Sequence, residues 1–220
     1  PIAIRAMRMK KHVYVEKPMA HTIYEARLMT KVAKEEGIVS QMGQNGHAGE
    51  GLRLTYEYIH DGAIGTVREV HGWSDRPAGW WPQAVLRPTD TPEVPETLNW
   101  DLWLGPAPMR PYHPDYTPFK WRGWHDYGCG AMGDMAVHNV DPAFFCLDLD
   151  APIAVEAETG KTAPETFPEW QIITYYFAEK NGRAPVKMLW YDGKKLPPKP
   201  EAMEDDLELP DNGLLFIGDE

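Results

Sequence analysis

The spacing of apolar positions predicts two helices and two strands in the first 46 residues. Helical spacing covers residues 2–11, which end in basic residues that suit the carboxyl end of a helix, and residues 21–36. Short strands are expected at 12–18, "HVYVEKP", and at 38–43, "IVSQMG". Helices that alternate with strands in this way are typical of a parallel α/β sheet with right-handed crossovers.

The carboxyl ends of these two strands are expected to form the rim of a ligand site, because ligands of parallel α/β sheets collect at that edge. Pro18 cannot donate a ladder hydrogen bond and disfavours helical geometry at Lys17, so the first strand should end with Glu16 and Lys17. Gln44 and His47 follow the second strand and are expected at the same rim.

The pattern then changes to a helix at 49–61 and a strand at 64–75. The next segment, 76–125, is rich in Pro and Trp: residues 77–118 contain ten of the 21 prolines, and residues 73–124 contain seven of the nine tryptophans. Such a segment is expected to be an ordered insertion. Its tryptophans could clamp it onto the domain, some could form an aromatic wall for a sugar ring, and both can be true of different residues.

The last third of the chain predicts one helix followed by several strands. The helix is expected at 134–149, and the strands at 152–159, 170–178, 185–192 and 212–219. Strands that follow one helix in this way favour an antiparallel or mixed sheet with one covered face.

Composition and charge are those of an ordinary globular protein and argue against a nucleic-acid partner. The chain is 43% hydrophobic and 25% charged. Its formal net charge is −11, but residues 201–220 carry eight acidic and no basic residues, and the other 200 residues hold 25 acidic against 22 basic residues. No basic face for a polyanion is expected. The two cysteines do not make a disulfide scaffold, and no apolar run of about 18 residues predicts a membrane span.

The segment "YGCGAMGDMAVH" at 127–138 contains the pattern G-x-G-x-x-G. A dinucleotide-binding loop with this pattern needs a hydrophobic strand directly before it and an acidic residue at the end of a second strand. The preceding residues, "FKWRGWHDY", are aromatic and charged, and the aspartates at 148 and 150 end a helix. The segment is therefore not expected to bind phosphate.

Asp134 and His138 stand out at the end of this segment. Asp134 is expected to begin the helix, where a carboxylate caps exposed N–H groups, and His138 lies four residues on, on the same helix face. An imidazole with a carboxylate one turn away can act as a general base in a fixed tautomer. The alternative interpretation is an N-cap aspartate beside an unrelated buried histidine.

The motif E-K-P at 16–18, together with the segment 128–138, resembles the Gfo/Idh/MocA oxidoreductase family. The family's patterns are E-K-P at the end of a Rossmann strand and G-G-G-x-x-x-D-x-x-x-H at the start of a helix in the second domain. The residues that match the second pattern are Gly128, Gly130, Asp134 and His138. Cys129 stands where the middle glycine is usual, and the segments at 100–124 and 212–219 also resemble members of this family.

The resemblance implies a fold and a domain division. The expected fold class is α/β with an α+β second domain, in which the tail of a parallel Rossmann-type sheet precedes a mixed or antiparallel open sheet with covering helices. Residues 1–46 would end an NAD(P)-binding Rossmann domain, and residues 47–220 would form a truncated substrate and oligomerisation domain that carries the insertion at 76–125. The family's phosphate loop lies upstream of E-K-P, so this chain is expected to be an internal segment that does not bind NAD normally or act by itself.

The resemblance also implies hydride transfer between the nicotinamide of NAD or NADP and a hydroxyl-bearing carbon of a sugar, cyclitol or derivative. His138 would accept the hydroxyl proton, while Asp134 would orient it or contact the substrate. Lys17 would stabilise negative charge on the reacting oxygen. The further residues expected at the cofactor are Glu16, Pro18, Gln44, Trp121 and Arg122. Those expected at the substrate are His47, Trp124 and His125.

Three alternatives stay open. Some relatives oxidise a sugar transiently with tightly bound NAD and cleave a glycosidic bond by elimination, without added NAD. A non-catalytic carbohydrate-binding or scaffold protein could keep the same fold. A metal site is the third alternative, with His125, Asp126, Cys129, His138 and Cys146 as its ligands. Their spacing matches no common zinc pattern, so no metal is expected at the site.

The partner implied by the resemblance is a small carbohydrate-like molecule, with neither nucleic acid nor a membrane-spanning segment involved. Copies of the chain are expected to associate through the open face of the second-domain sheet. A cytoplasmic location is expected.

Overall fold

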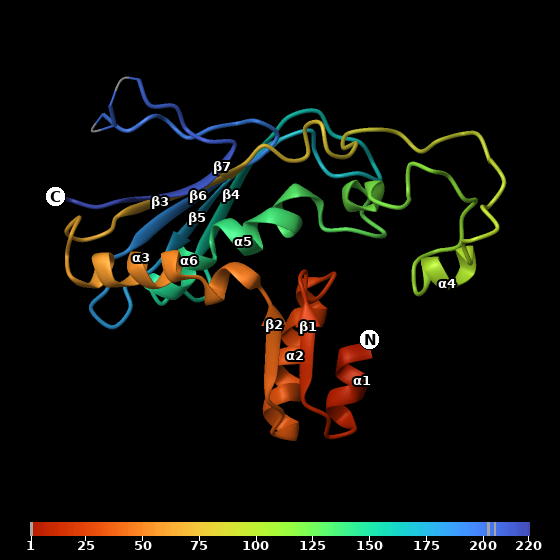
Figure 1. Ribbon diagram of the computed structural model, residues 1–220, viewed down its shortest axis with the longest axis horizontal. Coiled ribbons are helices and arrows are strands. Elements are labelled where there is room, and N and C mark those ends of the chain that lie inside the picture. The colour runs from red at the N-terminus through yellow and green to blue at the C-terminus, as the bar shows by residue number, and fades with distance from the viewer. Residues whose placement is uncertain (1, 202, 205) are drawn as a thin grey trace. The chain divides into compact units, whose positions relative to one another are not determined.

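The computed structural model describes residues 2–201, 203–204 and 206–220, and these form two compact units. The first ends at Gly49, and the second begins at Glu50 (Figure 1).

The N-terminal unit is a two-stranded parallel sheet with helices packed beside it. The strands β1 (Val13–Glu16) and β2 (Ser40–Gly43) pair in parallel, and the helices are α1 (Ile2–Arg8) and α2 (Ile23–Glu36). The buried core residues of this unit are Met7, Met29 and Val32. The predicted parallel α/β arrangement is confirmed.

The ends of α2 show why the chain folds this way locally. Thr22 Oγ1 accepts a hydrogen bond from the Glu25 backbone N–H at 3.1 Å, and the Glu25 carboxylate accepts one from the Thr22 N–H at 3.3 Å. This reciprocal pair is a capping box. At the other end Gly37 adopts a left-handed conformation with φ 65°, which ends the helix.

The second unit is built on a five-stranded mixed sheet in the order β4-β5-β6-β3-β7. The strands are β3 (Glu69–Ser74), β4 (Ala154–Thr159), β5 (Gln171–Phe177), β6 (Val186–Tyr191) and β7 (Asn212–Ile217). β3 runs parallel to β6, and the other neighbouring strands are antiparallel. The predicted mixed sheet is confirmed, and each strand lies within the segment predicted for it.

Helices cover one face of this sheet (Figure 1), and they include α3 (Glu50–His60), α5 (Val137–Asn139) and α6 (Asp141–Cys146). Gly72 in β3 allows them to approach closely, because a Cβ at this position would lie 2.6 Å from Val140 Cγ1. The segment that carries Asp134 and His138 therefore packs against β3 and the neighbouring edge strand β7.

The helix predicted at 134–149 is wrong in its start and in its continuity. Helical backbone begins at Gly130, and Met132–Ala136 form a π-helical turn that leads into α5. A turn at Val140 separates α5 from α6. Asp134 therefore lies inside the helical segment and does not cap its start. A π turn closes i→i+5 hydrogen bonds within an otherwise α-helical run, and the periodicity of apolar residues does not show it.

The Pro- and Trp-rich insertion is ordered around an aromatic core of its own. Its short helices include α4 (Trp100–Leu104) and the 3₁₀ turn η2 (Lys120–Gly123). The buried residues of its core are Trp100, Leu104, Tyr116 and Trp124. The indole N–H groups of Trp100 and Trp124 donate to backbone carbonyl oxygens at 2.7 and 2.9 Å. These tryptophans hold the insertion together, whereas Trp80 remains 46% exposed.

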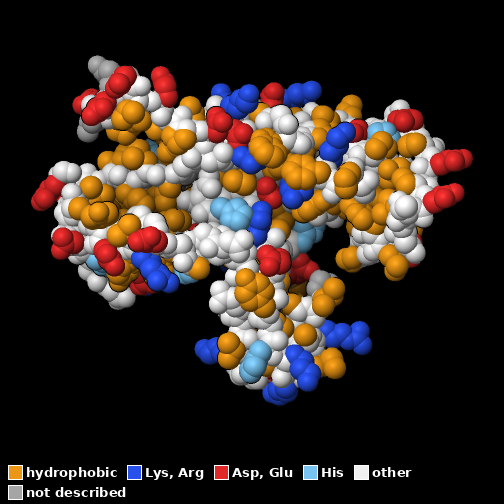
Figure 2. Space-filling view, viewed as in Figure 1, with side chains coloured by type: hydrophobic (Ala, Val, Ile, Leu, Met, Phe, Trp, Pro, Cys, Tyr) orange, Lys and Arg blue, Asp and Glu red, His pale blue; other side chains and the backbone are white. Residues whose placement is uncertain are grey.

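Negative charge gathers on the segment between β6 and β7. Figure 2 shows acidic side chains (red) at the upper left of the view, over this segment. Within residues 2–201, 203–204 and 206–220, no helix has the length and apolar character that crossing a membrane requires.

Asp192, directly after β6, is a fully buried carboxylate. It accepts hydrogen bonds from the Gln171 backbone N–H at 2.8 Å, from Gln171 Nε2 at 3.0 Å and from Trp190 Nε1 at 3.1 Å. Burial raises the pKa of Asp192 from 3.8 to about 6, although these hydrogen bonds act in the opposite direction. The folded chain therefore holds a proton on Asp192 more tightly than the unfolded chain does.

This raised pKa predicts a pH-dependent stability that Asp192→Asn removes. Between pH 4 and pH 7 the Asp192 carboxyl of the unfolded chain is mostly ionised, whereas that of the folded chain keeps its proton until about pH 6. The contribution of this carboxyl to the free energy of unfolding should therefore fall by on the order of 2–3 kcal/mol over this range. Urea unfolding of both proteins at several pH values measures this difference. The pKa values of Asp75 and Asp219 are lowered, so the contributions of these groups to the free energy of unfolding change with pH in the opposite direction. Both proteins contain these residues, so their contributions cancel when the two proteins are compared. A difference that is constant with pH, or that grows in favour of the wild type, would contradict the expectation.

Candidate active site

Two glycines in the 127–138 segment serve close packing. A Cβ at Gly128 would lie 2.5 Å from the backbone carbonyl oxygen of Arg122. Gly130 has φ +66°, and a Cβ there would lie 2.7 Å from the ring of Phe167. The residues just before them include the 3₁₀ turn η2, where a phosphate-binding loop would need a strand. Gly128 therefore allows the start of the helical segment to approach η2, and Gly130 allows it to approach Phe167.

This approach pairs Arg122 with Asp134. Arg122 Nε donates to Asp134 Oδ1 at 3.1 Å, and Arg122 Nη1 donates to the Phe119 carbonyl oxygen at 3.0 Å. The side chains of Arg122 and Asp134 are 21% and 13% exposed. A charge-assisted hydrogen bond in such a partly desolvated place fixes the carboxylate in one orientation. Arg122 was expected at the cofactor, and within this unit it holds Asp134.

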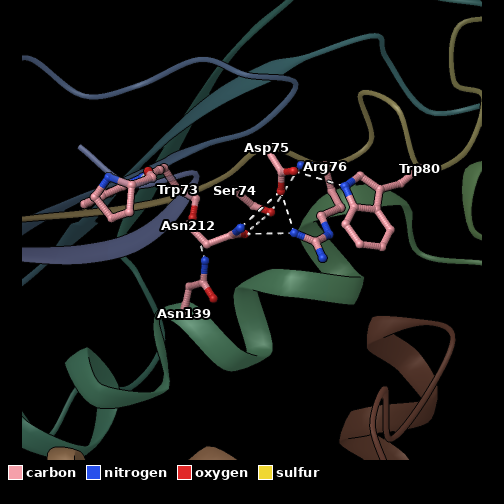
Figure 3. Close-up of polar contacts among 8 residues, drawn as sticks. Trp73, Ser74, Asp75, Arg76, Trp80, Asn139 and Asn212 are labelled. Carbon is pink, nitrogen blue, oxygen red and sulfur yellow. Dashed lines mark hydrogen bonds and ion pairs between the residues drawn. The ribbon is translucent and has the colours of Figure 1, made fainter. Parts of the chain in front are cut away.

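Asn139 fixes the segment that carries His138 to the sheet. Its Nδ2 donates to the backbone carbonyl oxygen of Trp73 at 2.5 Å, at the end of β3 (Figure 3). His138 directly precedes Asn139 in α5 and is partly buried, as is Asp134 four residues before it. The sequence reasoning missed Asn139. The signal that could have identified it was its position beside the Asp134–His138 motif.

A polar network continues from this point around the end of β3 (Figure 3). Ser74 Oγ donates to Asn212 Oδ1 at 2.7 Å, Asn212 Nδ2 donates to Asp75 Oδ1 at 3.1 Å, and Arg76 Nη1 donates to Asp75 Oδ1 at 2.5 Å. Burial opposes ionisation of Asp75, but hydrogen bonds from Trp80, Arg76 and Asn212 outweigh it and lower the pKa of Asp75. The carboxylate therefore stays charged, and it holds the loop after β3 against β7.

In the N-terminal unit, the expected site residues lie at the carboxyl ends of the parallel strands. Glu16 ends β1 opposite Gly43 of β2, and a Cβ at Gly43 would lie 2.6 Å from Glu16 Oε2, so the carboxylate lies over the glycine. Lys17 and Pro18 follow, joined by a cis peptide bond, and both are partly buried.

The loop after β2 supplies further polar groups to this unit. Gln44 is 7% exposed, and its Oε1 accepts a hydrogen bond from the Gly46 backbone N–H at 3.3 Å. His47 is exposed in the 3₁₀ turn η1 (Asn45–Ala48). An ammonium group, a carboxylate and amide groups at the carboxyl edge of parallel strands fit the amide and hydroxyl groups of a nicotinamide nucleotide.

The remaining predicted residues lie in the insertion. Trp124 was expected at the substrate, and within the second unit it packs in the core of the insertion: it is 1% exposed, and its indole N–H donates to the Asp115 carbonyl oxygen. Tryptophan spacing alone did not separate a core tryptophan from a surface one. His125 is exposed, with its ring 4.5 Å from the ring of Phe167. Trp121 is partly buried, and its ring lies 4.5 Å from the Arg122 guanidinium carbon.

The alternative metal site finds no support in the side-chain geometry. Across the described ranges, which omit residues 1, 202 and 205, no three His, Cys, Asp or Glu side chains converge as ligands of a metal ion. Cys146, one of the alternative ligands, is 3% exposed in the core beneath the sheet. Burial, with a smaller effect of Asp141, raises the pKa of its thiol to about 11, which disfavours the thiolate that a metal requires.

The chain is similar to two curated proteins that act on sugars. It is 28% identical over 143 residues to levoglucosan dehydrogenase from Pseudarthrobacter phenanthrenivorans, covering 64% of this chain and 28% of the relative. It is 27% identical over 158 residues to 1,5-anhydro-D-fructose reductase from Ensifer adhaerens, covering 69% of this chain and 35% of the relative. The matches thus span about a third of these relatives' lengths or less.

Solved structures share the fold. The WlbA dehydrogenase from Bordetella pertussis, described in complex with NADH and UDP-GlcNAcA, matches with a TM-score of 0.60 and 18% identity, over 99% of this chain and 49% of that chain. An oxidoreductase domain protein from Kribbella flavida matches with a TM-score of 0.53 and 25% identity, over 86% of this chain and 44% of that chain.

Two family models match the chain. The model "Oxidoreductase family, NAD-binding Rossmann fold" matches residues 1–44. The model "Oxidoreductase family, C-terminal alpha/beta domain" matches residues 64–184, which is more than half of the chain. The chain belongs to the Gfo/Idh/MocA oxidoreductase family.

Proposed function

We propose that the complete protein is an NAD(P)-dependent oxidoreductase acting on a sugar, a cyclitol or a related compound. The observation that carries this proposal is the carboxylate of Asp134, held by Arg122 in the helical segment that also carries His138. Alcohol oxidation needs a positioned base and a group that stabilises the charge on the oxygen. The family match and the sugar names of the two curated relatives support the substrate class.

In this proposal the chain's own side chains handle the proton and the charge. His138 accepts the proton of the substrate hydroxyl, and Asp134 orients the imidazole or contacts the substrate. Lys17 donates a hydrogen bond to the reacting oxygen and stabilises its negative charge. When bound, NAD or NADP supplies the hydride acceptor or donor. In the reverse direction His138 returns the proton to the oxygen.

The same proposal assigns the surroundings of the reacting groups. Residues 1–46 are assigned to the nucleotide-binding domain, and residues 47–220 are assigned to the substrate domain. The residues assigned to the cofactor are Glu16, Lys17, Pro18, Gln44, Trp121 and Arg122. His47 and His125 are assigned to the substrate. Association of copies through the sheet face opposite the helices, and a cytoplasmic location, belong to this proposal as well.

Released nucleotide tests the proposal directly. The product of the complete reading frame is denatured beside the 220-residue chain, and the supernatants are analysed by mass spectrometry for NAD(H) and NADP(H). We expect nucleotide from the complete product, little or none from the 220-residue chain, and sugar-dependent reduction of the nucleotide. Cleavage of a glycoside without added nucleotide would favour transient oxidation instead. A complete product that neither retains nor takes up nucleotide would refute the proposal.

A further inference from the structure

Trp80, in the loop after β3, is exposed and yet held in place. Its side chain is 46% exposed, which is unusual for so large an apolar group. Its indole Nε1 donates to Asp75 Oδ2 at 3.0 Å, and the guanidinium carbon of Arg76 lies 3.8 Å from its ring centroid (Figure 3). Asp75 and Arg76 are themselves fixed by Asn212 of β7. Contacts that fix a ring without covering it leave a rigid aromatic surface toward solvent.

A second exposed ring links Trp80 to the proposed catalytic carboxylate. The ring of Phe119 is 40% exposed, and its centroid lies 6.5 Å from that of Trp80, with 34° between the ring planes. The guanidinium carbon of Arg122 lies 4.0 Å from the Phe119 centroid, and Arg122 binds Asp134. Successive contacts therefore run from Trp80 through Phe119 and Arg122 to Asp134, all within the second unit.

The polar groups around Trp80 indicate which ligand this surface fits. The guanidinium group of Arg76 lies over one face of the indole, and Trp80 remains 46% exposed with this group in place. The charge of Arg76 is balanced by Asp75, which disfavours a strongly anionic ligand. A neutral ring with apolar C–H groups on its faces and hydroxyls around its edge matches an aromatic plane that has a carboxylate at its edge. A pyranose has this form.

We propose that Trp80 is a specificity-determining residue whose exposed indole face packs against the pyranose ring of the substrate, with Asp75 and Arg76 holding the indole in place. The inference rests on the proposed function for the identity of the site and deepens it by naming a residue that contacts the ring of the substrate. Phe119 extends the same surface toward Asp134.

The test compares Trp80→Ala and Trp80→Phe with wild type in the product of the complete reading frame. The probes are levoglucosan and 1,5-anhydro-D-fructose, the sugars in the names of the two relatives. Turnover gives kcat and KM for sugar and nucleotide separately, and calorimetry gives sugar affinity without turnover. Loss of an aromatic contact worth about 1.4 kcal/mol corresponds to tenfold in affinity. Trp80→Ala is therefore expected to raise the sugar KM about tenfold and leave the nucleotide KM unchanged. Trp80→Phe should stay within about threefold of wild type, because it keeps an aromatic plane.

Tyr58→Ala is the matched control, because Tyr58 is a 63% exposed aromatic residue on α3. It should change neither KM. Turnover with an unchanged sugar KM in Trp80→Ala would overturn the inference and leave the proposed function standing. If wild type binds the sugar without turnover, and Trp80→Ala abolishes this binding, the inference would be supported and the proposed function overturned. Wild type that neither turns over nor binds these sugars would overturn the pyranose assignment.

Discussion

Replacing His138 with glutamine is expected to lower kcat by about 10²- to 10⁴-fold, the range over which a positioned general base acts. The substitution removes the imidazole that the proposal assigns to the hydroxyl proton and keeps a side chain of similar size. KM for the sugar should change little, because the effect falls on proton transfer. The remaining rate should rise with hydroxide concentration, since solvent then takes the proton. Steady-state kinetics across a pH series, with thermal unfolding to confirm the fold, measure both effects.

The matched control for this prediction is His60→Gln. His60 ends α3, and its Nε2 lies 3.0 Å from the Cys146 carbonyl oxygen, a contact that a glutamine amide can replace. This variant should keep kcat within about twofold of wild type, as expected for substitutions away from the reacting groups. If kcat of His138→Gln stays within a few-fold of wild type while the variant is folded, His138 is not the base.

Gly128→Ala is expected to lower the free energy of unfolding of the second unit by about 1–3 kcal/mol, the usual cost of overpacking. The added methyl group would lie 2.5 Å from the Arg122 carbonyl oxygen and 2.7 Å from its Cα. These are backbone atoms and cannot swing aside as a flexible side chain would. The chain around η2 must therefore shift, and with it the guanidinium group that holds Asp134. Denaturant unfolding measures the loss of stability, and kcat should fall as well.

Gly51→Ala makes the same chemical change, and we expect it to have the opposite effect on the free energy of unfolding. Gly51 lies in α3, and a Cβ at this position would meet no atom within 4 Å. Alanine is favoured over glycine in helices by about 0.5–1 kcal/mol, so this variant should be at least as stable as wild type. Equal stability of Gly128→Ala and wild type would show that the close approach to Arg122 relaxes without cost.

The sequence predicted the elements whose patterns are local. The helical spacing over residues 21–36 and the strand segments that contain β3 to β7 each depend on a few neighbouring positions, and the structure confirms these elements. The contact between Arg122 and Asp134 was not predicted, because it depends on a loop that Gly128 permits to fold back. The π turn at Met132–Ala136 was missed because a single widened turn changes the apolar spacing over only a few residues.

The tryptophans also show that tertiary packing could not be predicted from the sequence. Residue type predicted that some would pack and others would face a ligand, but could not assign Trp124 to the core and Trp80 to the surface. That assignment depends on which carbonyl or carboxylate oxygen each indole N–H reaches, Asp115 in one case and Asp75 in the other. Both oxygens are placed by tertiary packing of the insertion.

The position of β3 between β6 and β7 has a consequence for the kinetics of folding. Glu69 pairs with Lys187 on one side and with Ile217 on the other, so β3 is made long before either partner strand. Loop closure over such separations is slow, and it follows the local contacts of the helices. During synthesis one edge of β3 stays unpaired until β6 is available, and the other edge stays unpaired until β7 is available. We therefore expect chaperones to bind the exposed strand edge of a ribosome-bound chain that ends before β7.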